Sequence, residues 1–216
     1  MHIDVYHDTV CPWCRIGLHN LAKALEGWQG PAVTVRLRPF LLDPGAPPEG
    51  YDLREHLAAK YGAVDLEPMF ERVTQAGARI GVKFDFAKVT RMPDTRLSHV
   101  LIEAAGDALA LPVAEALHKA YFEEGRDISA DKVLLEAAVK GGMDKPAARA
   151  AITACDATGF IRSDARAATR KGVRAVPHFV IGRQVLTGAQ PVEVLRAALQ
   201  EAAGTADLAA DQPACE

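Results

Sequence analysis

The chain has 216 residues, of which 49% are hydrophobic and 25% are charged, and its formal net charge at pH 7 is −3. This composition is ordinary for a globular protein and allows a sizeable core in one elaborated domain or two small ones. The slight negative charge gives no reason to expect a nucleic-acid partner, and no run of about 18 apolar residues predicts a membrane span. The first residues lack the basic and apolar regions of a secretory signal, so we expect a cytoplasmic protein.

Residues 1–48 carry the pattern of a β-α-β unit. Residues 2–6 alternate and are rich in Ile, Val and Tyr, which is typical of a short strand. Pro12 fits the first position of a helix, where its missing N–H costs nothing, and apolar residues follow it at helical spacing. Because residues 33–37 alternate again, we expect a second strand that runs parallel to the first.

The middle of the chain has a helical pattern instead of the strand patterns that come before it. A proline- and glycine-rich stretch at residues 39–50 marks a boundary, and from there to about residue 154 the pattern predicts helices only. The longest patterns predict two separate helices, at residues 95–109 and 112–124. We interpret residues 49–154 as an inserted all-α helical domain.

Strand patterns return near the C-terminus. Two short ones flank Gly182-Arg183, a two-residue turn that predicts a hairpin, and helical patterns precede and follow them. We assign residues 155–204 to this second α-β-β-α part and residues 205–216 to a flexible tail. Together with residues 1–48, it predicts an α/β protein with a thioredoxin fold and a large inserted all-α helical domain.

Cys11 and Cys14 stand at the beginning of the first predicted helix. The first amide N–H groups of a helix have no internal partner, and a cysteine beside them has its pKa lowered. Cysteines three residues apart on a helix can close a disulfide with modest adjustment. We therefore interpret Cys11 as the more exposed attacking thiol, Cys14 as the resolving thiol that faces the core, and the Cys11–Cys14 bond as redox-active. Pro12 fixes the first turn, and Trp13 offers an apolar wall to substrates.

Two other interpretations of this cysteine pair carry less weight. A structural disulfide does not suit a chain expected in a reducing compartment. A zinc site would need two further ligands, and the sequence has no second Cys-x-x-Cys and no His-x3-His. We therefore expect a redox centre without a metal.

The other cysteines and three histidines receive structural interpretations. Cys155 lies at a helix junction and is interpreted as a small buried side chain. Cys215 lies in the tail and is interpreted as taking no part in the chemistry. The alternative is that it forms a mixed disulfide with Cys11 or Cys155. His56, His99 and His118 fall in helical segments and are interpreted as partly buried or surface side chains.

A second motif, Val176-Pro177, lies just before the returning strand. In the expected fold a proline at this place follows a cis peptide bond and faces the cysteine pair, so we expect Val176 and Pro177 to bind substrate through exposed backbone groups. Asp8 and His178 are candidates to tune the site. The alternative for Asp8 is a role as a loop or cap residue. The alternative for His178 is that the alternation of side chains along the strand turns it away from the thiols.

Five motifs spread from one end of the chain to the other are shared with a known family: Asp8-x-x-Cys11-Pro12-Trp13-Cys14, Arg38-Pro39-Phe40-Leu41-Leu42-Asp43-Pro44, Tyr121-Phe122-x-Glu124-Gly125-Arg126-Asp127-Ile128, Gly172-Val173-x-x-Val176-Pro177 and Leu186-x-Gly188-Ala189-Gln190-Pro191. Over residues 3 to about 200 the chain resembles DsbA-family thioredoxin-fold oxidoreductases of the FrnE-like subgroup. The resemblance implies thiol–disulfide oxidoreductase or isomerase activity through Cys11 and Cys14. Asp94 stands where relatives usually carry asparagine.

We predict an enzyme that exchanges disulfides through a mixed-disulfide intermediate. Its partner is a protein or small thiol with a disulfide or dithiol, bound in a groove between the proline loop and the helical insertion. No cofactor is required, and glutathione is the candidate thiol co-substrate; the protein is a monomer or a homodimer. Two alternatives stay open: a glutathione-dependent transferase or isomerase of the kappa and hydroxychromene-carboxylate isomerase type, and a non-enzymatic, redox-switched binding or chaperone module. Members of the first typically have serine at the nucleophile position and lack the second cysteine.

Overall fold

The computed structural model describes residues 1–62, 65–154 and 157–210. Its helices and strands, in chain order, are β1 (His2–His7), α1 (Pro12–Leu25), β2 (Thr34–Pro39), β3 (Tyr51–Asp52), α2 (Leu53–Tyr61), α3 (Glu67–Ala78), β4 (Arg91–Met92), α4 (Arg96–Phe122), α5 (Asp131–Lys140), α6 (Lys145–Thr153), α7 (Ala157–Arg170), β5 (His178–Ile181), β6 (Gln184–Thr187) and α8 (Val192–Ala210). Within the described residues, no helix has the length and apolarity needed to cross a membrane.

Four strands form one mixed sheet in the order β2-β1-β5-β6. Strand β1 runs parallel to β2, as the β-α-β pattern predicts, and antiparallel to β5, which pairs with β6 in the predicted hairpin. Along β1 every second side chain is buried, and these are Ile3, Val5 and His7. A histidine thus occupies a core position at the end of the central strand, just before the turn that leads to the cysteine pair.

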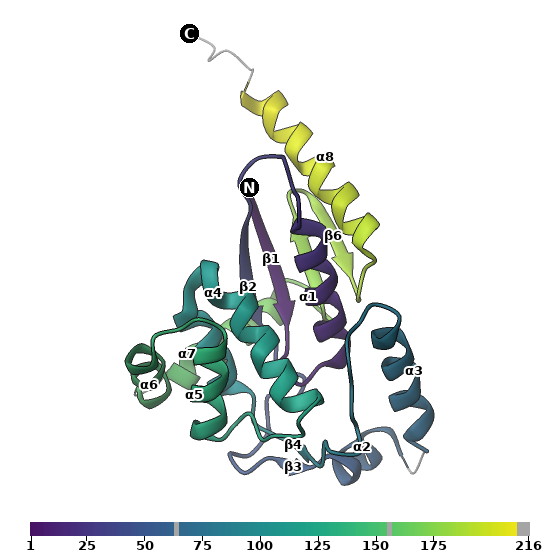
Figure 1. Cartoon of the computed structure of the whole chain (residues 1–216), viewed down its shortest axis with the longest axis vertical. Coiled ribbons are helices and arrows are strands. Elements are labelled where there is room, and N and C mark those ends of the chain that lie inside the picture. Colours follow the sequence, from purple (N-terminus) through teal and green to yellow (C-terminus); the bar gives the residue numbers. More distant parts are fainter. Residues whose placement is uncertain (63–64, 155–156, 211–216) are drawn as a thin grey trace.

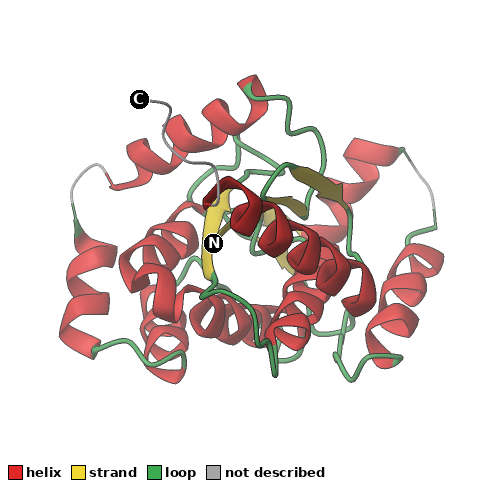
Figure 2. Ribbon diagram, turned by 90° about the horizontal axis from the view of Figure 1, so that it is seen from above, coloured by secondary structure: helices red, strands yellow, loops and turns green. Residues whose placement is uncertain are grey.

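Helix α1 begins beside the end of β1 (Figure 1). The cysteine pair at the beginning of α1 therefore lies at the end of the sheet, beside this central strand. Cys14, Leu18 and Leu21 follow the helical repeat and are buried, so this face of α1 packs on the sheet. Helix α8 packs against α1, while α7 and α4 contact β2. Seen from above, helices surround the strands (Figure 2).

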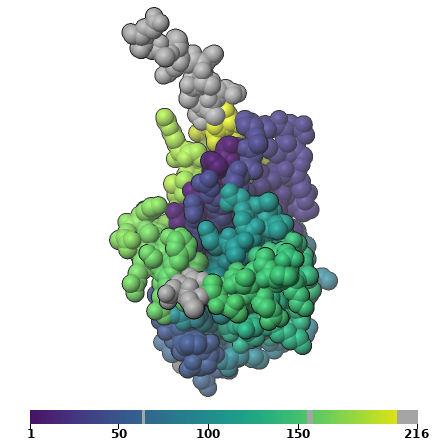
Figure 3. All heavy atoms as spheres, turned by 90° about the vertical axis from the view of Figure 1, so that its left-hand side faces the viewer, coloured from purple at the N-terminus to yellow at the C-terminus, as the bar shows by residue number. Residues whose placement is uncertain are grey.

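Five helices, α2 to α6, lie between β2 and α7 in the chain and build the helical insertion. An α/β fold with such an insertion agrees with the sequence prediction, although the domain limits drawn from the sequence stay predictions. Figure 3 shows the atoms of residues from about 100 to 150, in teal and green, gathered over one side of the molecule. The expectation of helices only is wrong in one detail, because β3 and β4 pair as a two-stranded sheet.

Two helices end elsewhere than the pattern predicts. Helix α4 continues through Pro112 and is instead broken at Gly106, whose φ of 67° and ψ of 170° are not helical. Glycine adopts positive φ readily, so the break falls there. Helix α8 runs past Gly204 to Ala210, where we expected a flexible tail. One glycine costs a helix only about 1 kcal/mol, and the alanines beyond it favour helix.

Candidate active site

Cys11 is the N-cap of α1, with φ −87° and ψ 113°, and Pro12 is the first helical residue. The backbone N–H of Cys11 donates to the carbonyl of Asp8 at 3.1 Å. Its own carbonyl accepts from the backbone N–H groups of Cys14 at 3.1 Å and of Arg15 at 3.2 Å. The turn after β1 and the first turn of α1 therefore fix both cysteines against the end of the sheet.

Both cysteines are free thiols that differ in burial. Cys11 is 5% exposed and Cys14 is 0% exposed, which agrees with a core-facing Cys14 but makes Cys11 less open than the sequence suggests. Burial raises the pKa of the Cys14 thiol well above its usual value, and a hydrogen bond with Cys11 raises it further. Its buried environment therefore favours the neutral thiol of Cys14.

The loop before β5 covers Cys11. The peptide bond between Val176 and Pro177 is cis, as expected, and the Cys11 thiol donates to the carbonyl of Val176 at 3.8 Å. Gly17 makes this approach possible, because a Cβ there would lie 2.7 Å from Cγ of Pro177. The sequence pattern did not single out Gly17. Its signal was a glycine inside a predicted helix, which costs about 1 kcal/mol and often marks a close contact.

Trp13 on α1 and His178 at the beginning of β5 contact residues other than the cysteine pair. Trp13 is half-buried, and the guanidinium of Arg72 on α3 lies 5.8 Å from the centroid of its ring. His178 is held in the sheet, with Nδ1 3.0 Å from the hydroxyl of Thr187 and its ring edge-on to Tyr6. Burial lowers the pKa of His178. Its contacts join it to neighbouring strands, so the structure does not bring it to the thiols.

Asp8 lies in the turn between β1 and α1 and is only 1% exposed. Its Oδ2 accepts a hydrogen bond from the backbone N–H of Leu42 at 2.7 Å, and its Oδ1 lies 3.4 Å from Nε2 of His99. Asp8 is therefore a buried loop residue whose carboxyl group is held by Leu42 and lies next to His99.

His99 and His118 are buried as well, at 3% and 0% exposure, which corrects the expectation of ordinary helical histidines. The ring of His99 lies 5.0 Å from that of His7, edge to face. Burial lowers the pKa of His118 to about 3, and burial lowers that of His7 well below 6.5. His56 stays half-buried and stacks on Tyr51, away from this cluster.

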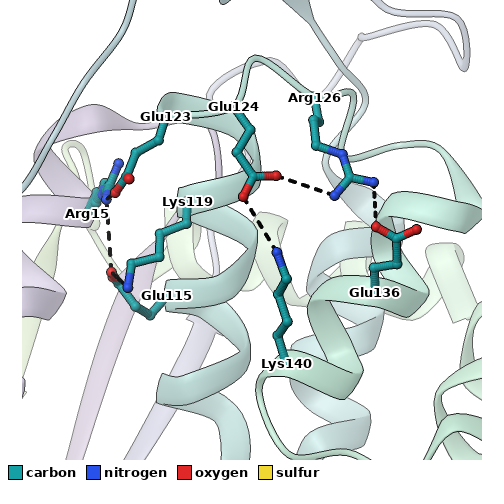
Figure 4. Close-up of polar contacts among 8 residues, drawn as sticks. All are labelled: Arg15, Glu115, Lys119, Glu123, Glu124, Arg126, Glu136 and Lys140. Atoms are coloured by element: carbon teal, nitrogen blue, oxygen red, sulfur yellow. Dashed lines mark hydrogen bonds and ion pairs between the residues drawn. The ribbon is translucent and has the colours of Figure 1, made fainter.

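The residue after Cys14 is a buried arginine. Arg15 is 1% exposed, donates to the carbonyl of Lys83 at 2.6 Å, and forms an ion pair with Glu123 at the end of α4 (Figure 4). Glu115 lies 3.9 Å from the same guanidinium, which also lies 5.1 Å from the centroid of the Phe84 ring. A full positive charge is therefore neutralised inside the protein, between α1 and the insertion.

The surface is hollowed near this site. One open cavity of about 600 Å³ is lined by α3, residues 81–85, Lys88 and Glu123, beside Arg15 rather than over the thiols. In the part of the chain that the structure describes, no group of three or more His, Cys, Asp or Glu side chains could hold a metal ion. Cys155 and Cys215 lie outside the described residues.

A family model described as a DSBA-like thioredoxin domain matches residues 2–200. The chain belongs to this family. The fold and the thiol pair at the beginning of α1 agree with that membership, and the family includes oxidoreductases and isomerases that act on thiols or disulfides.

Individual relatives agree with the family assignment. The uncharacterized protein YwbO of Bacillus subtilis (strain 168) is 26% identical over 203 residues, which cover 93% of this chain and 96% of YwbO. The solved structure of the probable DsbA oxidoreductase SCO1869 from Streptomyces coelicolor is 28% identical, with a TM-score of 0.79 over 100% of this chain and 93% of that one. The cytosolic disulfide reductase DsbM from Pseudomonas aeruginosa, solved with GSH, shares the fold at 19% identity, with a TM-score of 0.63 over 98% and 100% of the chains.

Proposed function

We propose that this DSBA-like protein is a thiol–disulfide oxidoreductase or isomerase that uses Cys11 and Cys14, within the FrnE-like subgroup. The observation that carries the proposal is the asymmetry of the pair. Cys11 caps α1 and meets the carbonyl of Val176, whereas Cys14 is wholly buried one turn further on. The thiol of Cys11 can react with a substrate, whereas the thiol of Cys14 can react only with Cys11.

The proposed reaction has two steps. The thiolate of Cys11 attacks a substrate disulfide, forms a mixed disulfide and releases the first substrate thiol. The thiolate of Cys14 then attacks Cys11 Sγ, which closes the Cys11–Cys14 disulfide and releases the second substrate thiol. Two electrons pass from the protein to the substrate, and the reverse sequence oxidises a substrate dithiol.

The substrate lies on the outer side of Cys11 in this proposal. Backbone groups of Val176 and Pro177 bind an extended peptide or a small thiol, Trp13 supplies an apolar wall, and Pro12 holds the first helical turn. Glutathione is the proposed small thiol, since DsbM of the same fold was solved with GSH. The proposed compartment is the cytoplasm, where such a thiol reduces the Cys11–Cys14 disulfide for the next cycle.

Reduction of insulin disulfides tests the proposal, with the wild type, Cys11→Ser and Cys14→Ser compared at equal concentration. We expect the wild type to reduce insulin, Cys11→Ser to lose the activity, and Cys14→Ser to accumulate a mixed disulfide visible by mass spectrometry. Undiminished turnover of Cys14→Ser with saturable glutathione binding favours the transferase or isomerase alternative. Client binding without turnover when both cysteines are serine favours the binding module.

A further inference from the structure

One stretch of the surface carries a strong excess of positive charge. Residues 162–174, which run from the middle of α7 into the loop after it, contain five cationic side chains and one anionic one, in a chain whose net charge is −3. All five cationic side chains are exposed, and they are Arg162, Arg166, Arg170, Lys171 and Arg174. Figure 3 shows this segment, in light green, on one flank of the molecule. A local excess of one charge favours partners of the opposite charge.

Most of these cations have no carboxylate partner. Within the described part of the chain, neither an ion pair nor a side-chain hydrogen bond is formed by Arg166, Arg170, Lys171 or Arg174. Elsewhere on the surface exposed cations pair with carboxylates, as Arg54 does with Glu67 at 2.8 Å. The N–H donors of these four side chains are therefore available to water or to a partner.

The stability of α7 accounts for only part of this charge. Cations near the last turn of a helix interact favourably with its dipole, and Arg170 and Lys171 lie there. This effect falls off within one turn, so it does not explain Arg162 or Arg166, and Arg174 lies in the loop beyond the helix. The spacing of Arg162, Arg166 and Arg170 even places like charges four residues apart, which destabilises a helix slightly. The charge therefore calls for an explanation outside the fold.

Two of the arginines line a cavity on this face. The cavity measures about 170 Å³ and lies between α7 and the loop after β2, and its lining residues are Leu41, Pro44, Arg162, Ala165, Arg166 and Thr169. Apolar lining residues suit the methylene groups of a short side chain, and a guanidinium binds a carboxylate through two parallel N–H groups. The lining therefore fits the acidic side chain of a glutamate or an aspartate.

The charged segment leads directly to the cysteine pair. Arg174 lies two residues before Val176, and two residues span at most about 7 Å. The thiol of Cys11 donates to the carbonyl of Val176 at 3.8 Å. A polypeptide that reacts at Cys11 and continues past this loop therefore meets Arg174 first and the charged face of α7 after it.

We propose that residues 162–174 form a docking surface for an acidic segment of a polypeptide substrate. The surface holds this segment while a neighbouring disulfide or dithiol of the same polypeptide reacts at Cys11. The inference rests on the thiol-exchange function proposed above and adds to it a class of substrate. Because the docking charges are exposed, they act mainly on the rate of encounter, and salt weakens their effect.

Two matched peptides test the proposal. Each carries one internal disulfide, with a run of glutamates beside it in the first peptide and glutamines in their place in the second. We expect the reduced wild type to reduce the glutamate peptide at least about fivefold faster at low ionic strength, and about 0.5 M NaCl to remove most of this preference. The triple variant with Arg166→Gln, Arg170→Gln and Arg174→Gln should lose the preference, with less than about a twofold change for the glutamine peptide.

The matched control removes the same amount of charge elsewhere. Arg79 after α3 and Lys145 and Arg149 on α6 are exposed, and their joint replacement by glutamine should leave the preference intact. Circular dichroism checks the fold of each variant. Where the triple variant is unfolded, Arg174→Gln alone decides the matter, because Arg174 is an exposed loop residue, and it should at least halve the preference.

Binding is measured separately from turnover. By fluorescence anisotropy, the protein with Cys11→Ser and Cys14→Ser should bind the labelled glutamate peptide at least about fivefold more tightly than the glutamine peptide, and the triple substitution should remove this difference. A triple variant that keeps the preference, or a wild type that reduces both peptides equally, overturns this inference and leaves the proposed function standing.

Two further outcomes separate the proposals. If the double-serine protein binds the glutamate peptide through these cations but the wild type reduces neither peptide, the proposed function fails and the docking surface stands. Tighter binding of a single-stranded oligonucleotide or of phosphatidylglycerol vesicles, lost in the same triple variant, overturns the assignment of this surface to a polypeptide.

Discussion

The two sides of the cysteine pair are built in different ways. The outer side consists of Trp13 within the motif and a cis-proline loop that meets the thiol of Cys11 through one backbone carbonyl. The inner side is a layer of buried ionisable side chains, to which α4 of the insertion supplies His99 and His118, and Glu123 just after α4 pairs with Arg15. Short-range sequence motifs specify the outer side, whereas packing between insertion and core specifies the inner one. Substitutions on the inner side should therefore lower the unfolding free energy more than substitutions on the outer side.

The largest expected effect is that of Glu123→Gln, which removes the carboxylate that neutralises Arg15. A guanidinium that is 1% exposed would then lack its closest counter-charge, because Glu115 is 3.9 Å away. Breaking a buried pair in this way costs about 3–5 kcal/mol, and partial exposure of Glu123 places the expected loss of unfolding free energy near the lower figure. Urea unfolding at pH 7 measures it.

The neighbouring residue gives the matched control. Glu124 pairs with Arg126 and Lys140 at the surface, as Figure 4 shows, and lies 41% exposed. Glu124→Gln should therefore lower the unfolding free energy by less than about 1 kcal/mol. Equal losses of unfolding free energy for Glu123→Gln and Glu124→Gln would show that the buried ion pair stabilises the protein no more than the surface ion pair does.

The next largest effect is a loss of stability in acid. His118 and His7 are neutral in the folded protein, because burial lowers their pKa values, to about 3 for His118. The unfolded chain binds protons at both near pH 6.5, so their contribution is complete above that pH and falls as the pH drops toward the folded values. At pH 5 we expect His118 to account for a loss of roughly 2 kcal/mol of unfolding free energy, and His7 to lower it in the same direction. Urea unfolding from pH 7.5 to 5 should show this slope, reduced in His118→Gln and unchanged in the control His56→Gln.

The buried histidines and Asp8 are the part of the site that the sequence does not predict. The split β-α-β frame, the hairpin and the cis bond before Pro177 follow from local signals and a recognisable pattern of elements. The meeting of Asp8 with His99 does not, because 91 residues separate them and no periodicity states which helix face meets the turn after β1. His7 alone carried a usable signal, since it continues the buried alternation of Ile3 and Val5.

A smaller effect is expected on the outer side for Gly17→Ala. The new Cβ would lie 2.7 Å from Pro177 Cγ and 3.1 Å from Phe179 Cζ, and such overpacking costs about 1–3 kcal/mol. Alanine regains about 1 kcal/mol of helix propensity, so the expected net loss is about 0–2 kcal/mol, with slower attack by Cys11. Gly159→Ala on α7 has open space at its Cβ and should instead raise the melting temperature. A stabilised Gly17→Ala protein would show that the loop does not pack tightly on α1.

The smallest effect is expected where Arg72 covers Trp13. The guanidinium lies 5.8 Å from the ring centroid on an exposed part of α3, and an exposed cation–π contact contributes about 0.5–1 kcal/mol. A double-mutant cycle with Arg72→Gln and Trp13→Phe, followed by urea unfolding, should give a coupling energy in this range or below. The same cycle with Glu71→Gln in place of Arg72→Gln should give none. A coupling above about 2 kcal/mol would mean that the outer side stores as much interaction energy as the buried layer. The insertion would then serve mainly as a wall for substrate, and the inner charges would be incidental to the site.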